Sequence, residues 1–172
     1  MQCIVHLLKG RIWVESEPGS GSTFFFITPF KQVISELKNI LDDIPFDHNF
    51  SGKQILIVED NAVSSFFLQE TLSTTGAKLY LAANGRTALE IFKNNIDIDL
   101  VLLDIQLPEI SGYQVAREMK KIRESVPIIA QTAYGSLDDK KKCLLAGCSD
   151  YLRKPVDPID LLAKLATAFN KS

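Results

Sequence analysis

From Gln54 onward, short apolar runs alternate with longer segments whose apolar residues recur at helical spacing. The runs predict five strands, at 55–58, 78–82, 100–103, 127–130 and 150–152. The segments between and after them predict helices at 62–74, 86–94 and 113–124, a fourth from Ser136 to Gly147, and a fifth opened by Asp157 and Pro158. This alternation predicts right-handed βαβ crossovers, and therefore an α/β fold with a doubly wound five-stranded parallel sheet.

Residues 1–30 have a different pattern. Apolar residues at helical spacing predict a helix that ends at Gly10. Two short strands are predicted after it, at 11–16 and 23–27, joined by a glycine-containing turn. An isolated two-stranded hairpin is marginally stable in water, and these aromatic-rich strands need a sheet and helices that the chain does not obviously supply. We interpret this part as an α/β-hairpin fragment of a larger domain.

A connecting segment, residues 31–52, separates the two patterns. Its apolar residues recur at helical spacing and predict one amphipathic helix that ends before Pro45: Val33, Leu37, Ile40, Leu41 and Ile44. Two interpretations stay open for this helical linker. It can transmit a signal, or it can be a spacer helix that packs on whichever domain is nearer.

Composition narrows the classes of function. The formal net charge of −2 and the pI near 5.7 give no sign of a nucleic-acid-binding or membrane-binding surface. No apolar run approaches the roughly 20 residues that cross a bilayer, and the N-terminus does not resemble a signal peptide, so we expect a cytoplasmic location. Three cysteines and two histidines, all scattered, make a zinc site improbable and predict reduced thiols.

Polar residues of complementary chemistry follow four of the predicted strands. Glu59 and Asp60 come after the first strand, Asp104 after the third, Thr132 after the fourth and Lys154 after the fifth. The carboxyl ends of parallel strands meet at one edge of the sheet, so these side chains are expected to lie together. Carboxylates about 4 Å apart repel by roughly 4 kcal/mol per pair at an effective dielectric near 20, so a cation must offset the repulsion.

Oxygen ligands without sulfur or imidazole select Mg²⁺ or a similar ion. Together with a carboxylate nucleophile, a lysine and a hydroxyl, such a metal predicts a phosphoryl-acceptor site. Two other functions fit less well. A flavin- or nucleotide-binding protein would need an anion cradle after the first strand, where Glu59 and Asp60 repel phosphate. An aspartate-based phosphatase would need a second acid two residues after Asp104, and Gln106 stands there.

Residues 53–172 closely resemble the receiver domain of two-component response regulators, which has a flavodoxin-like fold. The site residues of that family can be matched in order along the chain: Glu59, Asp60, Asp104, Gln106, Thr132, Tyr151 and Lys154. The resemblance implies Mg²⁺ held by Glu59, Asp60, Asp104 and the main-chain carbonyl of Gln106. Two departures exist, because Glu59 replaces the commoner aspartate and Leu107 stands where methionine is usual.

The resemblance also implies a role for each residue in phosphorelay signalling. Asp104 would accept a phosphoryl group from a phosphohistidine, assisted by Lys154 and Thr132. Thr132 and Tyr151 would form a switch that changes the face made by the fourth helix, fifth strand and fifth helix. A pseudo-receiver, which binds proteins without carrying phosphate, is the alternative, although it would be expected to lack one of the site residues.

The segment from Gly10 to Phe24 resembles the last hairpin of the ATP-binding domain of sensor histidine kinases. We therefore predict three parts: residues 1–30 as a C-terminal remnant of that domain, 31–52 as a linker and 53–172 as the receiver. The family's Mg-ATP-binding segments and phosphorylated histidine have no counterpart here, so no kinase activity is expected of residues 1–30. The resemblance implies a hybrid sensor histidine kinase, with the kinase dimerisation domain and a histidine phosphotransfer protein as partners.

Overall fold

The computed structural model describes residues 10–17, 19, 21–27, 29, 48–133 and 137–170. For residues 137–139 it describes the backbone only. The chain divides into two compact units, Met1–Asp43 and Ile44–Ser172, and each is described by itself. Three predictions lie outside the described residues: the helix before Gly10, the linker helix and the Ser136 cap. None of the helices in the described ranges is long and apolar enough to cross a membrane.

The second unit contains the predicted parallel sheet. Its strands are β3 (Gln54–Val58), β4 (Lys78–Ala82), β5 (Leu100–Asp104), β6 (Ile128–Thr132) and β7 (Asp150–Arg153). They lie side by side in the order β4-β3-β5-β6-β7, and every neighbouring pair is parallel. This order confirms the predicted doubly wound topology, in which the chain reverses its winding direction between β3 and β5.

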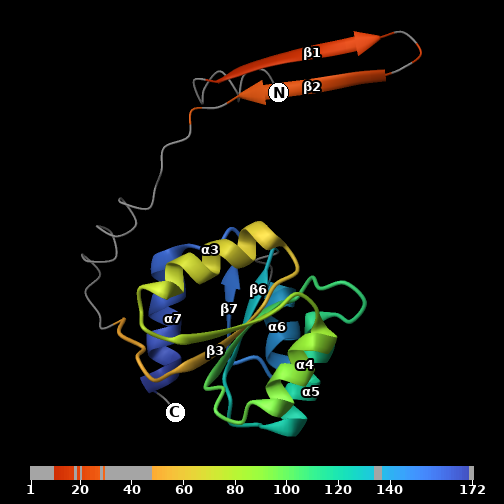
Figure 1. The fold of residues 1–172 in the computed structure, drawn as a ribbon. Coiled ribbons are helices and arrows are strands. Elements are labelled where there is room, and N and C mark those ends of the chain that lie inside the picture. Colours follow the sequence, from red (N-terminus) through yellow and green to blue (C-terminus); the bar gives the residue numbers. More distant parts are fainter. Residues whose placement is uncertain are drawn as a thin grey trace. The chain divides into compact units, whose positions relative to one another are not determined.

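Five helices cover the sheet, with α3 and α7 on one face and α4, α5 and α6 on the other (Figure 1). Their bounds are α3 (Ala62–Ser73), α4 (Gly85–Asn94), α5 (Gly112–Ile122), α6 (Leu137–Leu145) and α7 (Pro158–Asn170). The predicted cap at Asp157 is confirmed, and Asn61 makes an equivalent cap that was not predicted. The Asp157 carboxylate accepts hydrogen bonds from the amides of Ile159 and Asp160, and Asn61 caps α3 in the same way.

The sheet is buried because helices cover both of its faces. All five residues of β5, the central strand, are buried, which explains why its sequence is an unbroken apolar run up to Asp104. Phe50, within the segment that sequence analysis assigns to the linker, is also buried and packs edge-on against Phe169, with ring centroids 5.1 Å apart. The packed part of this unit therefore includes residues ahead of the first strand.

Gln131 on β6 is an exception within this core. It is fully buried, and neither its amide nitrogen nor its amide oxygen has a hydrogen-bond partner among the described residues. Because an unpaired buried polar group costs about 1–3 kcal/mol, we predict that Gln131→Met raises the free energy of unfolding by about 1 kcal/mol. Urea unfolding measures this change.

Gln69→Met is the matched control for this prediction. The Gln69 amide lies on α3 and donates to the Ser65 carbonyl oxygen at 3.2 Å, so the same substitution there removes a hydrogen bond. It should leave the stability unchanged or lower it. A loss of stability in Gln131→Met would show that the Gln131 amide is paired in solution.

The first unit contains an antiparallel hairpin of β1 (Arg11–Glu17) and β2 (Gly21–Ile27). Trp13 and Phe25 are register partners whose rings stack with centroids 5.2 Å apart. Phe24 and Phe26 point to the opposite face, where each is 68% exposed. Both faces of the hairpin are therefore apolar, as expected for strands that are covered on two sides.

We predict that this hairpin makes the chain self-associate, because exposed apolar faces and strand edges favour pairing between chains. Light scattering on residues 1–172 should give a mass that rises with protein concentration. Residues 48–172, which lack the hairpin, should stay monomeric. Equal, concentration-independent masses for the two proteins would contradict the prediction, and Phe24→Ser with Phe26→Ser in the full chain should reduce association.

Candidate functional site

Three acidic side chains gather at the carboxyl ends of β3 and β5. Glu59 follows β3 directly, Asp60 comes next, and Asp104 is the last residue of β5. One carboxylate oxygen from each lies within 4.8 Å of the others. Glu59 and Asp104 are buried at 3% exposure each, whereas Asp60 is exposed. The site thus occupies the point where the winding of the sheet reverses, which is where open α/β sheets bind ligands.

Lys154 joins this cluster from the segment after β7. Its Nζ donates to Glu59 Oε2 and to Asp104 Oδ2, both at 2.6 Å, and so bridges the two buried carboxylates. Burial by itself lowers the pKa of Lys154, but the hydrogen bonds to Asp104 and Glu59 outweigh it and raise the pKa. For Glu59, burial dominates and raises the pKa of the carboxyl group, and the Lys154 hydrogen bond offsets part of this effect.

The backbone around Asp104 holds its carboxylate in place. The amide N–H of Gln106 donates to Asp104 Oδ1 at 2.8 Å, so both carboxylate oxygens of Asp104 are engaged. Gly112, the first residue of α5, donates its N–H to the Ile105 carbonyl oxygen at 3.0 Å. A Cβ atom on Gly112 would overlap the Asp104 carbonyl oxygen, so only glycine allows the loop to close this tightly behind Asp104.

Asn61 and Gly112 were not predicted as parts of this site. The Asn61 amide N–H donates to Glu59 Oε1 at 3.3 Å, while its side chain caps α3. The position of Asn61 just before a helix is a recognisable cap signal, but its contact with Glu59 depends on the fold. For Gly112 the sequence signals only a loop, because the close approach to β5 comes from packing.

Thr132 lies on β6, the strand next to that of Asp104, and Tyr151 lies on β7, one strand further. Thr132 is buried at the end of β6, and its carbonyl oxygen accepts a hydrogen bond from the Lys154 N–H at 2.8 Å. Tyr151 on β7 is the register partner of Ala130 and is half-buried against the core beneath α4, α5 and α6. Lys154 therefore contacts both Glu59 and Asp104 directly, whereas Thr132 and Tyr151 lie on the two strands beyond β5.

The acidic cluster fits a hard divalent cation such as Mg²⁺. Three carboxylates converge, and the Lys154 ammonium already occupies a cation's place between two of them. Oxygen-only donor sets suit Mg²⁺, which keeps several waters and needs few protein ligands. Gln106 contributes its N–H in this structure, and the predicted role of its main-chain carbonyl as a ligand stays a prediction. The Lys154–Pro155 peptide bond is cis.

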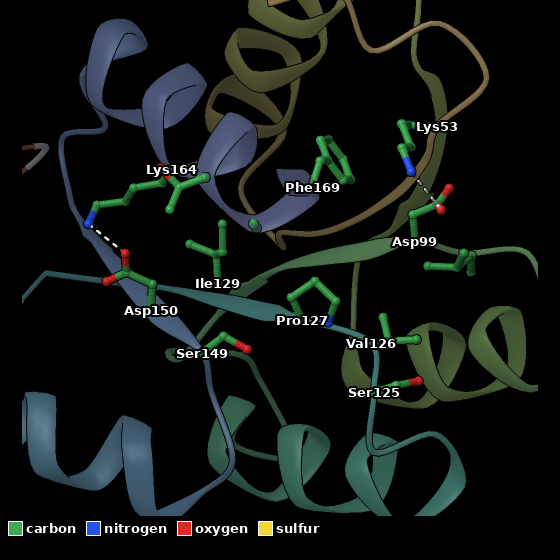
Figure 2. Close-up of a pocket in the computed structure, with 13 residues that line it drawn as sticks. Lys53, Asp99, Ser125, Val126, Pro127, Ile129, Ser149, Asp150, Lys164 and Phe169 are labelled. Atoms are coloured by element: carbon green, nitrogen blue, oxygen red, sulfur yellow. Dashed lines mark hydrogen bonds and ion pairs between the residues drawn. The ribbon is translucent and has the colours of Figure 1, made fainter. Parts of the chain in front are cut away.

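A separate cavity of about 610 Å³ lies at the opposite, amino-terminal edge of the sheet (Figure 2). Its rim carries two ion pairs, Lys53 with Asp99 at 3.6 Å and Lys164 with Asp150 at 2.9 Å. None of the predicted site residues lines this cavity, so we do not assign the candidate functional site to it despite its volume.

Comparison with known proteins agrees with this geometry. Residues 55–166 match the family described as the response regulator receiver domain. The chain is 35% identical over 160 residues to the aerobic respiration control sensor protein ArcB of Escherichia coli strain K12, a match that covers 92% of this chain and 20% of ArcB. The chain therefore spans only a fifth of that relative's length.

Two solved structures are similar to the chain. The receiver domain of the sensor histidine kinase PA1611 from Pseudomonas aeruginosa PAO1, with a magnesium ion in its active-site cleft, is 34% identical with a TM-score of 0.65, covering 70% of this chain and 99% of that one. The receiver domain of Ssk1, in complex with the Saccharomyces cerevisiae histidine phosphotransfer protein Ypd1, is 35% identical with a TM-score of 0.64, covering 68% and 88%. This chain thus belongs to the response regulator receiver domain family of two-component phosphorelay signalling.

Proposed function

We propose that Asp104 accepts a phosphoryl group from a phosphohistidine of a histidine kinase and passes it to a histidine phosphotransfer protein. The observation that carries this proposal is the contact of Lys154 with both Asp104 and Glu59 at 2.6 Å. It places a fixed positive charge beside a buried carboxylate nucleophile at the open edge of the sheet.

In the proposed reaction, an oxygen of Asp104 forms a bond to phosphorus while the P–N bond to the imidazole breaks. The imidazole leaves with the electron pair of that bond. The Lys154 ammonium, already hydrogen-bonded to Asp104, is placed to donate to an oxygen of the incoming group, and the Gln106 N–H keeps the carboxylate oriented. Thr132, one strand away, offers a hydroxyl to the same group.

Glu59, Asp60 and Asp104 would hold Mg²⁺ in this proposal. When bound, the ion would neutralise the negative charge on the phosphoryl oxygens. Lys154 would give up part of its contact with the carboxylates when the ion is bound, since ammonium and metal would compete for the same oxygens. Weak, millimolar-range binding is expected because only three protein carboxylates contribute and one of them is exposed.

The surface beside Asp104 supports the proposal that protein partners bind there. Val63 and Phe66, in the first turns of α3, are 77% and 62% exposed. A cavity of about 320 Å³ next to them is lined by Phe67, Lys154 and Pro155, among others. An apolar patch at the rim of the acceptor site suits a protein helix that brings a histidine to Asp104. The Ssk1 receiver forms a complex with the phosphotransfer protein Ypd1 in the related structure.

Acetyl phosphate, a small phosphodonor, tests the metal requirement. With Mg²⁺, intact-mass analysis of the chain should show one added phosphoryl group, and chelation of the metal with EDTA should prevent it. Asp60→Asn, which removes one metal ligand and leaves the buried Glu59–Lys154–Asp104 contacts in place, should raise the Mg²⁺ concentration needed at least about tenfold. Phosphorylation at equal rates with and without metal would exclude the Mg²⁺ assignment.

A pseudo-receiver is the other candidate and predicts a different result. Such a module would bind its partner protein equally well with or without phosphodonor and would gain no mass.

We also propose that the chain comes from a hybrid sensor histidine kinase and works in the cytoplasm. The ArcB match over 92% of the chain supports the first point, because that match extends beyond the receiver region into the preceding residues.

A further inference from the structure

The ring of Tyr151 lies near two lysine ammonium groups. Lys140 Nζ, from α6, is 5.8 Å from the ring centroid, and Lys164 Nζ, from α7, is 5.7 Å from it. A cation within about 6 Å of an aromatic ring is attracted by the negative charge of the ring face. The two helices cover opposite faces of the sheet, so the contacts approach the edge strand β7 from both of its sides.

Acidic side chains fix the position of Lys164. Its Nζ pairs with Asp150 at 2.9 Å and lies 4.0 Å from Asp160, one turn earlier on α7. Figure 2 shows the Lys164–Asp150 pair at the rim of the cavity at the amino-terminal edge of the sheet. Because these acids restrain the long lysine side chain, less of its conformational entropy is lost on contact with Tyr151. Lys140 makes its contact from an exposed position on α6.

We propose that Lys140 and Lys164 are positioning residues that hold the Tyr151 ring in its present place and so oppose activation. The proposal rests on the proposed phosphorylation of Asp104 and on the switch role that the resemblance implies for Thr132 and Tyr151, in which Thr132 would move towards the phosphoryl group and Tyr151 would turn inward. In this proposal the present ring position is the outward one, and an inward turn would carry the ring away from both ammonium groups. The cation–π contacts would therefore stabilise only the unphosphorylated arrangement.

The size of the effect follows from the strength of such contacts. At exposed sites one cation–π contact changes an equilibrium by roughly two- to fivefold. Removing both is expected to raise the population of the inward ring by about four- to twenty-fivefold, if the contacts act independently. A larger population of the inward state should speed phosphorylation, because phosphorylation and the inward ring favour one another.

The test uses the full chain carrying Lys140→Ala, Lys164→Ala or both changes. Lys141→Ala is the matched control, because it removes the same charge from the next position of α6, which points about 100° away around the helix. The first measurement is the NMR chemical shift of the Tyr151 ring without any phosphodonor. The second is the initial rate of phosphorylation by acetyl phosphate with Mg²⁺.

Both lysine variants should move the ring signals towards those of the beryllofluoride-activated protein and raise the rate two- to fivefold, while Lys141→Ala leaves both unchanged. In a Tyr151→Leu background the gain from Lys140→Ala should vanish, because no ring remains to be held. Ring signals that move no further than in the control, or a gain that persists without Tyr151, would overturn the proposal. Absence of phosphorylation in the wild type would defeat the proposed function instead, and the ring shifts would still decide the role of the lysines.

Discussion

Asp104→Asn is expected to abolish phosphorylation of the chain by acetyl phosphate, lowering the rate at least about a thousandfold. An asparagine side chain has the same size but lacks the anionic oxygen that would bond to phosphorus. It can still accept the Gln106 N–H hydrogen bond, and Lys154 keeps its contact with Glu59 at 2.6 Å. The fold should therefore survive, and the loss should be chemical. Intact-mass analysis and phosphate-affinity gel electrophoresis measure it.

Asp99→Asn is the matched control for this experiment. Asp99 directly precedes β5, at the opposite edge of the sheet, where its carboxylate accepts the Gln54 N–H at 2.7 Å. The same change of charge there should leave phosphorylation as in the wild type. If Asp104→Asn gained a phosphoryl group as fast as the wild type, another residue would be the acceptor and the site assignment would be wrong.

The sheet could be predicted from the sequence because each strand is a short apolar run between turn signals. Burial on both faces makes every residue of β5 apolar except the last, so the acidic end of the run also marks Asp104, the proposed acceptor. Predicted strands ended one or two residues early at Asp104 and Thr132, since polar side chains at the edge of a sheet interrupt the apolar pattern but not the backbone pairing.

The contacts within the site could not be predicted in the same way. Lys154 lies 95 residues from Glu59 and 50 from Asp104 along the chain, and spacing alone does not say which carboxylates its ammonium reaches. The close approach of Gly112 to β5 and the unpaired amide of Gln131 likewise depend on packing. Strand order places residues at one edge, whereas side-chain conformation decides which of them touch.

Thr132→Ala is expected to separate phosphorylation from its effect on the face formed by α6, β7 and α7. The acceptor, its lysine and its metal ligands are untouched, and the Thr132 carbonyl can still accept the Lys154 N–H at 2.8 Å. Phosphorylation of Asp104 should therefore remain within a few-fold of the wild type. What is lost is the hydroxyl that would donate to a phosphoryl oxygen and draw β6 towards it.

Tyr151 transmits this movement in the proposed switch. It lies on β7 beside β6. In the proposed switch, a shift of Thr132 would open space into which the ring could turn. A ligand shifts a two-state equilibrium only by its difference in affinity for the two states, and the Thr132 hydroxyl is expected to supply much of that difference. Without it, the phosphate mimic beryllofluoride should still bind but should shift the NMR signals of residues 137–170 far less.

Thr71→Ala controls for the loss of a buried hydroxyl as such. Thr71 on α3 is buried to the same 3% exposure as Thr132, and its hydroxyl donates to the Phe67 carbonyl oxygen at 2.8 Å, away from the acceptor. This variant should lose about 1 kcal/mol of stability but keep the full beryllofluoride response. A Thr132→Ala protein whose residues 137–170 shifted as far as those of Thr71→Ala would show that β6 responds to phosphate without the hydroxyl.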